Sequence, residues 1–111
     1  MARASSTTVT IASSGTTSQA IDLGEWLVAG IITPSALTGT AFTFTASDTE
    51  GGTYQACYDS SGTAISVTVA ASRHILIEPQ TFAGARWLKL VSGTAEGAAR
   101  TITLVLHKRE G

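Results

Sequence analysis

Hydrophobic and polar residues alternate with a period of two along most of this chain. The clearest examples are AFTFTA at 41–46, AISVTVA at 64–70 and TITLVLH at 101–107. Such alternation places the apolar side chains on one face of a β-strand and the polar ones on the other. The pattern therefore predicts strands with one face in a core and the other facing solvent or a partner.

Similar runs recur along the whole chain, bounded by Gly, Ser, Asp or Pro, and the helical period is nearly absent. The nine predicted strands are 7–11, 18–23, 26–32, 41–46, 54–58, 64–70, 74–78, 86–91 and 101–107. We therefore predict an all-β fold, an antiparallel β-sandwich of about eight or nine short strands, and a jelly roll is one form that it could take.

The run WLVAGII at 26–32 differs from the others because it is apolar on both faces. In a two-layer protein this indicates a central strand whose outer side is also covered. The cover could be a loop of the same chain or another subunit, and the sequence leaves both open.

The length of 111 residues fits one domain, which would bury roughly 65% of the surface of the unfolded chain. We expect a flexible N-terminal arm at 1–8, a single sandwich domain at 9–107 and a short basic tail at 108–111. The Gly- and Ala-rich segment GTAEGAA at 93–99 is a further candidate for flexibility.

The segment SDTEGGTYQACYDSSGT at 47–63 contains acids, glycines, hydroxyls and the single cysteine. As a calcium loop starting at Asp48 it would need an oxygen ligand at its fifth position and glycine at its sixth, where the chain has Gly52 and Thr53. The pattern fails at these strict positions.

Two hairpin turns explain this segment better. EGG at 50–52 and DSSG at 59–62 each separate two predicted strands at the length of a hairpin loop. In the second turn, Asp59 can accept hydrogen bonds from nearby backbone N–H groups, and Gly62 can adopt the left-handed conformation.

Few side chains are candidates for catalysis or metal binding. Cys57, His74 and His107 are the only nitrogen or sulfur ligands of the kind zinc prefers, and no two have the spacing of a zinc site. Cys57 has no evident base to activate it, so we interpret it as an inert thiol whose direction the alternation leaves open. Asp22 and Glu25 flank a glycine turn and are interpreted as solvated loop acids rather than a glycosidase pair.

The motifs of serine hydrolases and of nucleotide-binding loops are also missing from the sequence. We therefore predict no enzyme activity, no cofactor and no metal.

Charge and hydropathy limit the partners. Only 14% of the residues are charged and the formal net charge is −1, which argues against a nucleic-acid partner. No apolar run approaches the roughly 20 residues needed to cross a bilayer, so we expect no membrane insertion. The first residues contain no apolar stretch typical of a secretory signal. A single cysteine and the absence of asparagine are compatible with a reducing cytoplasm.

Three phrases within residues 18–107 form a distinctive set. The first contains the strand end Ala46-Ser47-Asp48 and the turn Tyr58-Asp59-x-x-Gly62. The second runs from ASR at 71–73 through Pro79 to the long phrase FAGARWLKLVSGT at 82–94, and the third is RTITLV at 100–105. Together these phrases resemble a group of small virion proteins from tailed bacteriophages. Cys57 and Trp87 depart from the pattern of that group, where an aliphatic residue and Phe are expected.

The resemblance implies an antiparallel β-sandwich that binds the outside of a capsid as a decoration or cement protein. The implied partners are the major capsid protein and further copies of the chain, as a homodimer or homotrimer. The implied location is the capsid surface of the virion, after synthesis in the host cytoplasm.

Interface residues are predicted from alternation and residue type. In TFAGARWLKL at 81–90 we expect Arg86, Trp87 and Lys89 to face a partner while Leu88 and Leu90 point into the core, because Trp and Arg are frequent anchors of interfaces. We also predict that Trp26 and Val28, in the doubly apolar run at 26–32, contact a partner.

Two other functions remain open. One is another virion part, such as a head-tail connector, a tail protein or a fibre-base protein. The other is a carbohydrate-binding β-sandwich module that stacks sugar rings on its exposed aromatic side chains. The aromatic candidates are Trp26, Tyr54, Tyr58 and Trp87.

Overall fold

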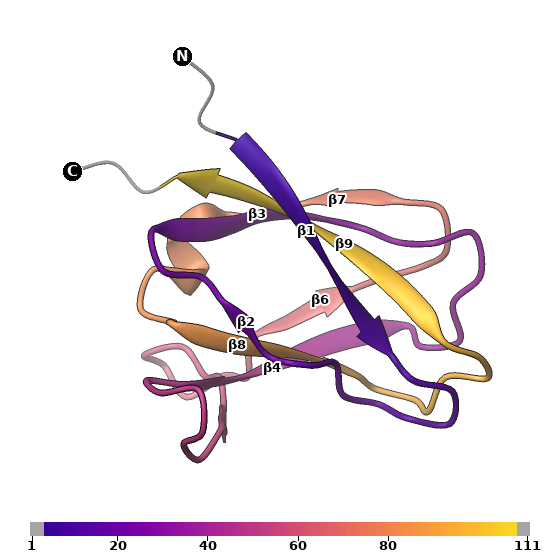
Figure 1. Ribbon diagram of the computed structural model, residues 1–111, viewed down its shortest axis with the longest axis horizontal. Coiled ribbons are helices and arrows are strands. Elements are labelled where there is room, and N and C mark those ends of the chain that lie inside the picture. The colour runs from indigo at the N-terminus through magenta and orange to yellow at the C-terminus, as the bar shows by residue number, and fades with distance from the viewer. Residues whose placement is uncertain (1–3, 109–111) are drawn as a thin grey trace.

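The computed structural model describes residues 4–108 and consists of two antiparallel β-sheets packed face to face (Figure 1). Sheet A has the order β1 (Ala4–Ile11), β9 (Arg100–Lys108), β3 (Trp26–Ile32) and β7 (His74–Leu76). Sheet B has the order β2 (Ile21–Asp22), β8 (Trp87–Ser92), β4 (Ala41–Ser47) and β5 (Gln55–Ala56), and β6 (Ser66–Thr68) also pairs with β4. A short 3-10 helix, η1 (Pro79–Phe82), precedes β8.

Each of the nine predicted strands overlaps one observed strand, so the all-β sandwich is confirmed. The agreement is closest for β3, whose bounds are those predicted. It is loosest for β2, β5 and β6, each of which has only two or three residues. In the part of the chain that the structure describes, no helix is long and apolar enough to cross a membrane.

The first half of the chain pairs with the second half in reverse order. β1 pairs with β9, β2 with β8, β3 with β7 and β4 with β6. The pairs β3–β9 and β4–β8 then join these hairpin-like units into two sheets. A long hairpin wound up in this way is a jelly roll, the form that the sequence analysis left open.

The core lies between the sheets and is built from the apolar positions of the alternating runs. Phe42 and Phe44 of β4 are at most 1% exposed, and the ring of Phe44 meets that of Phe82 edge to face with centroids 4.8 Å apart. The facing sheet contributes Ile102 and Leu104 of β9, which are equally buried. Inward side chains of two sheets thus interdigitate as the period of two predicted.

The predicted flexible arm at 1–8 requires a correction. β1 begins at Ala4 and pairs with β9 in an unbroken register up to Ile11, so residues 4–8 belong to the sandwich. These small residues form a strand because the long β9 offers them a complete ladder of backbone partners. Residues 1–3 lie outside the described part, as do residues 109–111 of the predicted basic tail, whereas Lys108 ends β9.

Both hairpin turns predicted in 47–63 are confirmed. The turn at 50–52 joins β4 to β5, which pair with each other. In the turn at 59–62, Oδ1 of Asp59 accepts hydrogen bonds from the N–H groups of Ser61 and Thr63, at 2.8 and 3.0 Å. Gly62 has a φ of +87°, a conformation that side chains disfavour. The polar segment is therefore a pair of loops.

Candidate functional site

The outer face of sheet B presents the aromatic and basic side chains of β8. Leu88 and Leu90 are 1% and 2% exposed in the core, while Trp87 and Lys89 lie half-buried on the opposite side of the strand. The predicted orientation of the phrase at 86–90 is therefore confirmed. Whether these side chains bind a partner stays a prediction.

Arg86 is held at one end of this face by an ion pair with Asp22. Its Nε donates to Oδ1 and its Nη2 donates to Oδ2 at 3.1 Å, so the contact is bidentate. Asp22 lies directly opposite Trp87 in the β2–β8 register, and Cζ of Arg86 is 5.9 Å from the centroid of the Trp87 ring. The hydrogen bond from Arg86 lowers the pKa of Asp22, and that of Arg86 is raised by the same contact.

Lys89 meets an aromatic ring from a different segment. Its Nζ lies 4.3 Å from the centroid of the Tyr54 ring, which is a cation–π distance. The hydroxyl of Tyr54 donates to the carbonyl of Glu50 at 2.9 Å, so the loop between β4 and β5 fixes the ring over Lys89. Two cation–aromatic contacts therefore lie on the same face of one sheet. We call Asp22, Tyr54, Arg86, Trp87 and Lys89 the β8 face.

The two contact residues predicted on β3 do not belong to this face. Val28 is 0% exposed and forms part of the core, so its assignment to an interface was wrong. The register of β3 shifts between Val28 and Gly30, a bulge that the alternation does not reveal, and Val28 points inward opposite Leu106. Trp26 lies in the other sheet, packs partly against the core and has Nζ of Lys108 5.9 Å from its ring centroid.

The outer side of sheet A presents apolar side chains around β3. Ile32 of β3 and Val105 of β9 alternate with the buried Ile31 and Leu104, and therefore face outward. Leu76 of β7, paired with Gly30, is 81% exposed. Within the described residues, neither a loop nor a helix shields Leu76.

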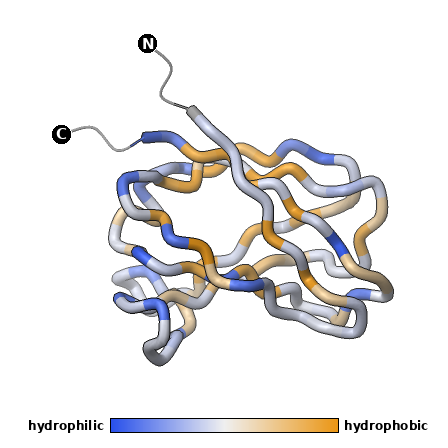
Figure 2. The backbone as a smooth tube through the Cα atoms, in the orientation of Figure 1, coloured by the Kyte–Doolittle hydropathy of each residue, from blue (hydrophilic) through white to orange (hydrophobic). Residues whose placement is uncertain are grey.

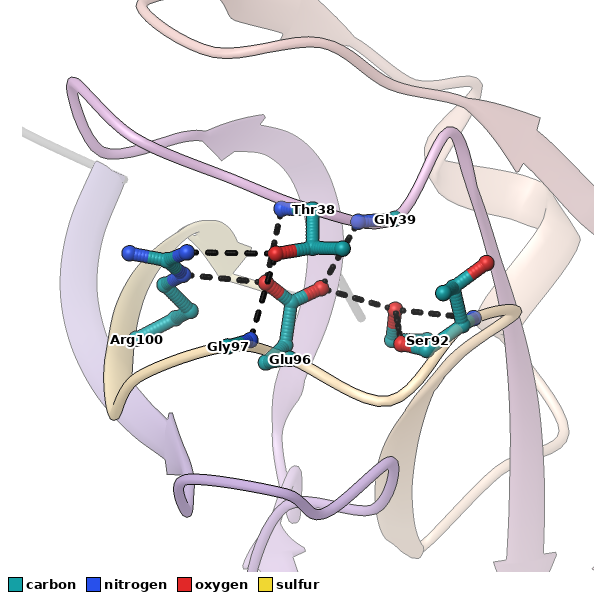
Figure 3. A network of polar contacts seen from close by, with 7 residues as sticks. Thr38, Gly39, Ser92, Glu96, Gly97 and Arg100 are labelled. Atoms are coloured by element: carbon teal, nitrogen blue, oxygen red, sulfur yellow. Dashed lines mark hydrogen bonds and ion pairs between the residues drawn. The ribbon is translucent and has the colours of Figure 1, made fainter.

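Glu96 is a buried carboxylate that sequence reasoning missed (Figure 3). It accepts hydrogen bonds from the N–H groups of Thr38 and Gly39 at 2.8 and 2.9 Å, from Oγ of Ser92 at 2.9 Å and from Nε of Arg100 at 2.9 Å. Burial would raise its pKa, but these four donors outweigh that effect and hold the pKa at about 2.

The Glu96 network corrects the expectation that 93–99 is flexible. Besides the side-chain contacts, the backbone of Glu96 exchanges hydrogen bonds with the loop at 14–15. Through its side chain and its backbone, Glu96 thus ties three loops together at one end of the sandwich. The available signal was an acid followed four residues later by an arginine, directly before the strand predicted at 101–107. Since the carboxylate is fully paired, we interpret its role as structural.

A groove of about 350 Å³ opens beside β5 and η1 and contains the single thiol. Cys57, Tyr58 and Phe82 line it together with alanines and a glycine. Cys57 is half-buried, and burial raises the pKa of its thiol, which disfavours the reactive thiolate. The groove lining includes no histidine, lysine or carboxylate that would activate it.

Histidines and acids are dispersed over the described surface. Across residues 4–108, no three His, Cys, Asp or Glu side chains gather in a group able to hold a metal ion. His74 and His107 are exposed on sheet A, and Glu25 forms a 3.8 Å ion pair with Lys108. Asp22 is paired with Arg86 instead.

Comparison with known proteins identifies no relative of this chain. No protein family model matches the chain, and no curated protein or solved structure matches it.

Proposed function

We propose that this protein is a non-enzymatic decoration protein that binds the outer surface of a bacteriophage capsid through its β8 face. The observation that supports the proposal best is the row of Arg86, Trp87 and Lys89 on the outside of sheet B, with Tyr54 fixed beside it. The phrases that resemble small phage virion proteins include this row, at 82–94. A rigid sandwich with an anchoring row suits a protein whose work is adhesion.

The geometry favours binding because the row is preorganised. Asp22 fixes the guanidinium of Arg86 and the Tyr54 ring fixes Lys89, so little side-chain freedom remains to be lost on association. Trp87 offers a large apolar area between two cations. This arrangement matches a partner surface that has an apolar patch rimmed by carboxylates, as we expect of the major capsid protein.

Adhesion of this kind gains from repetition. Each β8 face is small, but a homodimer or homotrimer that bridges neighbouring capsid subunits makes its second contact at high effective concentration. Many modest contacts repeated by the symmetry of the shell then hold that shell together. Decoration of a capsid therefore requires neither a catalytic group nor a cofactor from this chain.

The β8 face is less suited to sugar stacking. A carbohydrate ring needs an open aromatic face, whereas Lys89 already lies over one face of Tyr54 and Arg86 lies close to Trp87. A role elsewhere on the virion, in a head-tail connector, a tail or a fibre base, would use the same adhesive surface. Its distinguishing property is where the copies lie on the particle.

The test is co-sedimentation of the purified protein with expanded capsid shells, followed by electron microscopy of the decorated particles. We expect binding at symmetry-related positions over the whole shell, and weaker binding by a variant with Arg86→Ala and Lys89→Ala. Asp59→Ala, which alters an exposed side chain that is not part of the β8 face, serves as the control. Binding confined to the neck or tail would support the connector or tail alternative, and binding to a glycan array but not to shells would overturn the proposal.

A further inference from the structure

β1 is an edge strand that the fold leaves open. It borders sheet A with only β9 beside it (Figure 1), and its eight residues, Ala4–Ile11, stay in register along their whole length. The other bordering strands of the described chain, β2, β5, β6 and β7, are two or three residues long. Short edges offer little to a partner, whereas a long one is a template for another strand.

The backbone direction shows which groups of β1 are open. The N–H of Thr10 donates to Oε1 of Gln19 at 2.9 Å, so Thr10 directs its backbone groups away from β9. Residues at a spacing of two direct theirs to the same side, which places those of Ser6 and Thr8 on the open edge. Both residues are exposed, and no described residue hydrogen bonds to either N–H on that side.

The loop after β1 protects only the end of the edge. Ile11 forms a bridge to Ser18, and Gln19 occupies the N–H of Thr10. From Thr8 back to Ala4 none of the usual devices against strand pairing is present, because this stretch has no charge, proline, glycine or bulge. Figure 2 draws β1 in near-white and orange, without the blue of charged residues.

We infer that β1 pairs antiparallel with β1 of a second copy, around a two-fold axis at Ser6. Ser6 then faces Ser6 of the second copy, and Ala4 faces its Thr8, so all three open positions are used. An axis at Thr7 would place Ala4 against Thr10, and an axis at Thr8 would place Ser6 against Thr10. In both cases the N–H of Thr10 is already engaged by Gln19.

The second copy fits this edge because the pairing is self-complementary. The residues that meet across the axis have only methyl and hydroxyl side chains, so no like charges approach each other. The two four-stranded sheets become one continuous eight-stranded sheet. A two-fold contact uses both open edges and closes the assembly at a dimer.

This dimer would supply the homo-oligomer of the proposed function, but it forms between isolated chains without a capsid. A pair of strands of this length buries less than the roughly 800 Å² per partner of a standard interface. We therefore expect a dimer that dissociates on dilution. Because its test requires no capsid, failure of the dimer and failure of the proposed function give different results.

Disulfide trapping tests the register, in a Cys57→Ser background so that the introduced thiol is the only one. Paired residues of this type have Cα atoms about 5.5 Å apart, which a disulfide can span. Ser6→Cys should therefore form a covalent dimer in most molecules on mild oxidation. Thr8→Cys, whose two copies would lie about 14 Å apart, should form at least tenfold less. Equal trapping at both positions, or none at Ser6, would overturn the pairing.

Sedimentation of the untrapped protein tests the same contact without a covalent bond. Ser6→Pro removes the N–H on the open edge and leaves the ladder to β9 intact, so it should be monomeric at concentrations where the parent chain is dimeric. Ser6→Ala keeps the N–H and should remain dimeric. A parent chain that stays monomeric at millimolar concentration, or a Ser6→Pro dimer of unchanged affinity, would contradict the inference and point to another surface.

Discussion

The backbone N–H of Gly39 donates to Oε2 of Glu96 at 2.9 Å, although the two residues lie 57 positions apart in the chain. Oε1 of the same carboxylate accepts from the neighbouring N–H of Thr38 and from Nε of Arg100. The loop before β4 is thereby fastened to the loop before β9. Both loops lie at the end of the sandwich where the long strands of the two sheets are connected (Figure 3).

Glu96→Gln should destabilise the protein by roughly 3 kcal/mol, because breaking a buried ion pair leaves a charge without its partner. The amide also offers one NH₂ group where the site supplies only donors, so a buried donor is left without an acceptor. Chemical denaturation of the variant and of the parent measures the difference. Glu78→Gln, at an exposed position, is the matched control and should change stability by less than about 0.5 kcal/mol.

The pH dependence of stability should report the same carboxylate. Its pKa is about 2 in the folded protein against an ordinary value of 4.5, so the folded state favours the ionised form by about 3 kcal/mol. A lowered pKa gives stability that is fully present above about pH 4.5 and is lost as the pH falls toward 2. The difference in melting temperature between parent and Glu96→Gln should shrink over this window. A difference that stays constant from pH 6 to pH 2 would show that the charge of Glu96 is not what stabilises the loops.

The strands could be predicted from the sequence because the period of two is a local property, and both sheets bury one face. What could not be predicted depends on partners far away in the chain. The strand character of residues 4–8 comes from β9, and the bulge between Val28 and Gly30 lets both Val28 and Ile31 point into the core. The burial of Glu96 requires donors 57 and 58 positions away. The β8 face was half predictable, since alternation orients Trp87 and Lys89 but does not reveal Tyr54 or Asp22 beside them.

Gly39→Ala should cost about 1–3 kcal/mol, because a Cβ there would lie 2.2 Å from Oγ of Ser92 and 3.1 Å from Oε2 of Glu96. Relief of the overlap would displace a hydroxyl that itself donates to Glu96. The control is Gly51→Ala, where an added Cβ meets nothing within 4 Å. Thermal unfolding of the two variants should separate them by several degrees, and equal melting temperatures would mean that the Ser92 side chain rearranges at no cost.

Cys57→Ser should leave capsid attachment unchanged and lower stability by about 1 kcal/mol. The thiol is half-buried against the core, so a hydroxyl in its place loses apolar contact and is poorly hydrated. Denaturation and shell co-sedimentation of the same sample measure both properties. If attachment is lost while stability is unchanged, the groove beside β5 and η1 has a role in binding that its lining does not suggest.

Trp87→Ala should weaken binding to shells at least tenfold while lowering stability by only about 1 kcal/mol, because the ring is half-buried on the outside of sheet B. Leu88→Ala, one position along the same strand, removes a side chain that is 1% exposed and should cost about 2–5 kcal/mol without altering the contact surface. Occupancy on the particle is measured at a temperature where both variants are folded, and melting temperature is measured separately. Trp87→Ala should lower occupancy more than melting temperature, and Leu88→Ala should do the reverse. A Trp87→Ala variant that binds shells like the parent would remove the β8 face as the capsid contact. The exposed apolar side of sheet A around Leu76 would then be the next surface to test.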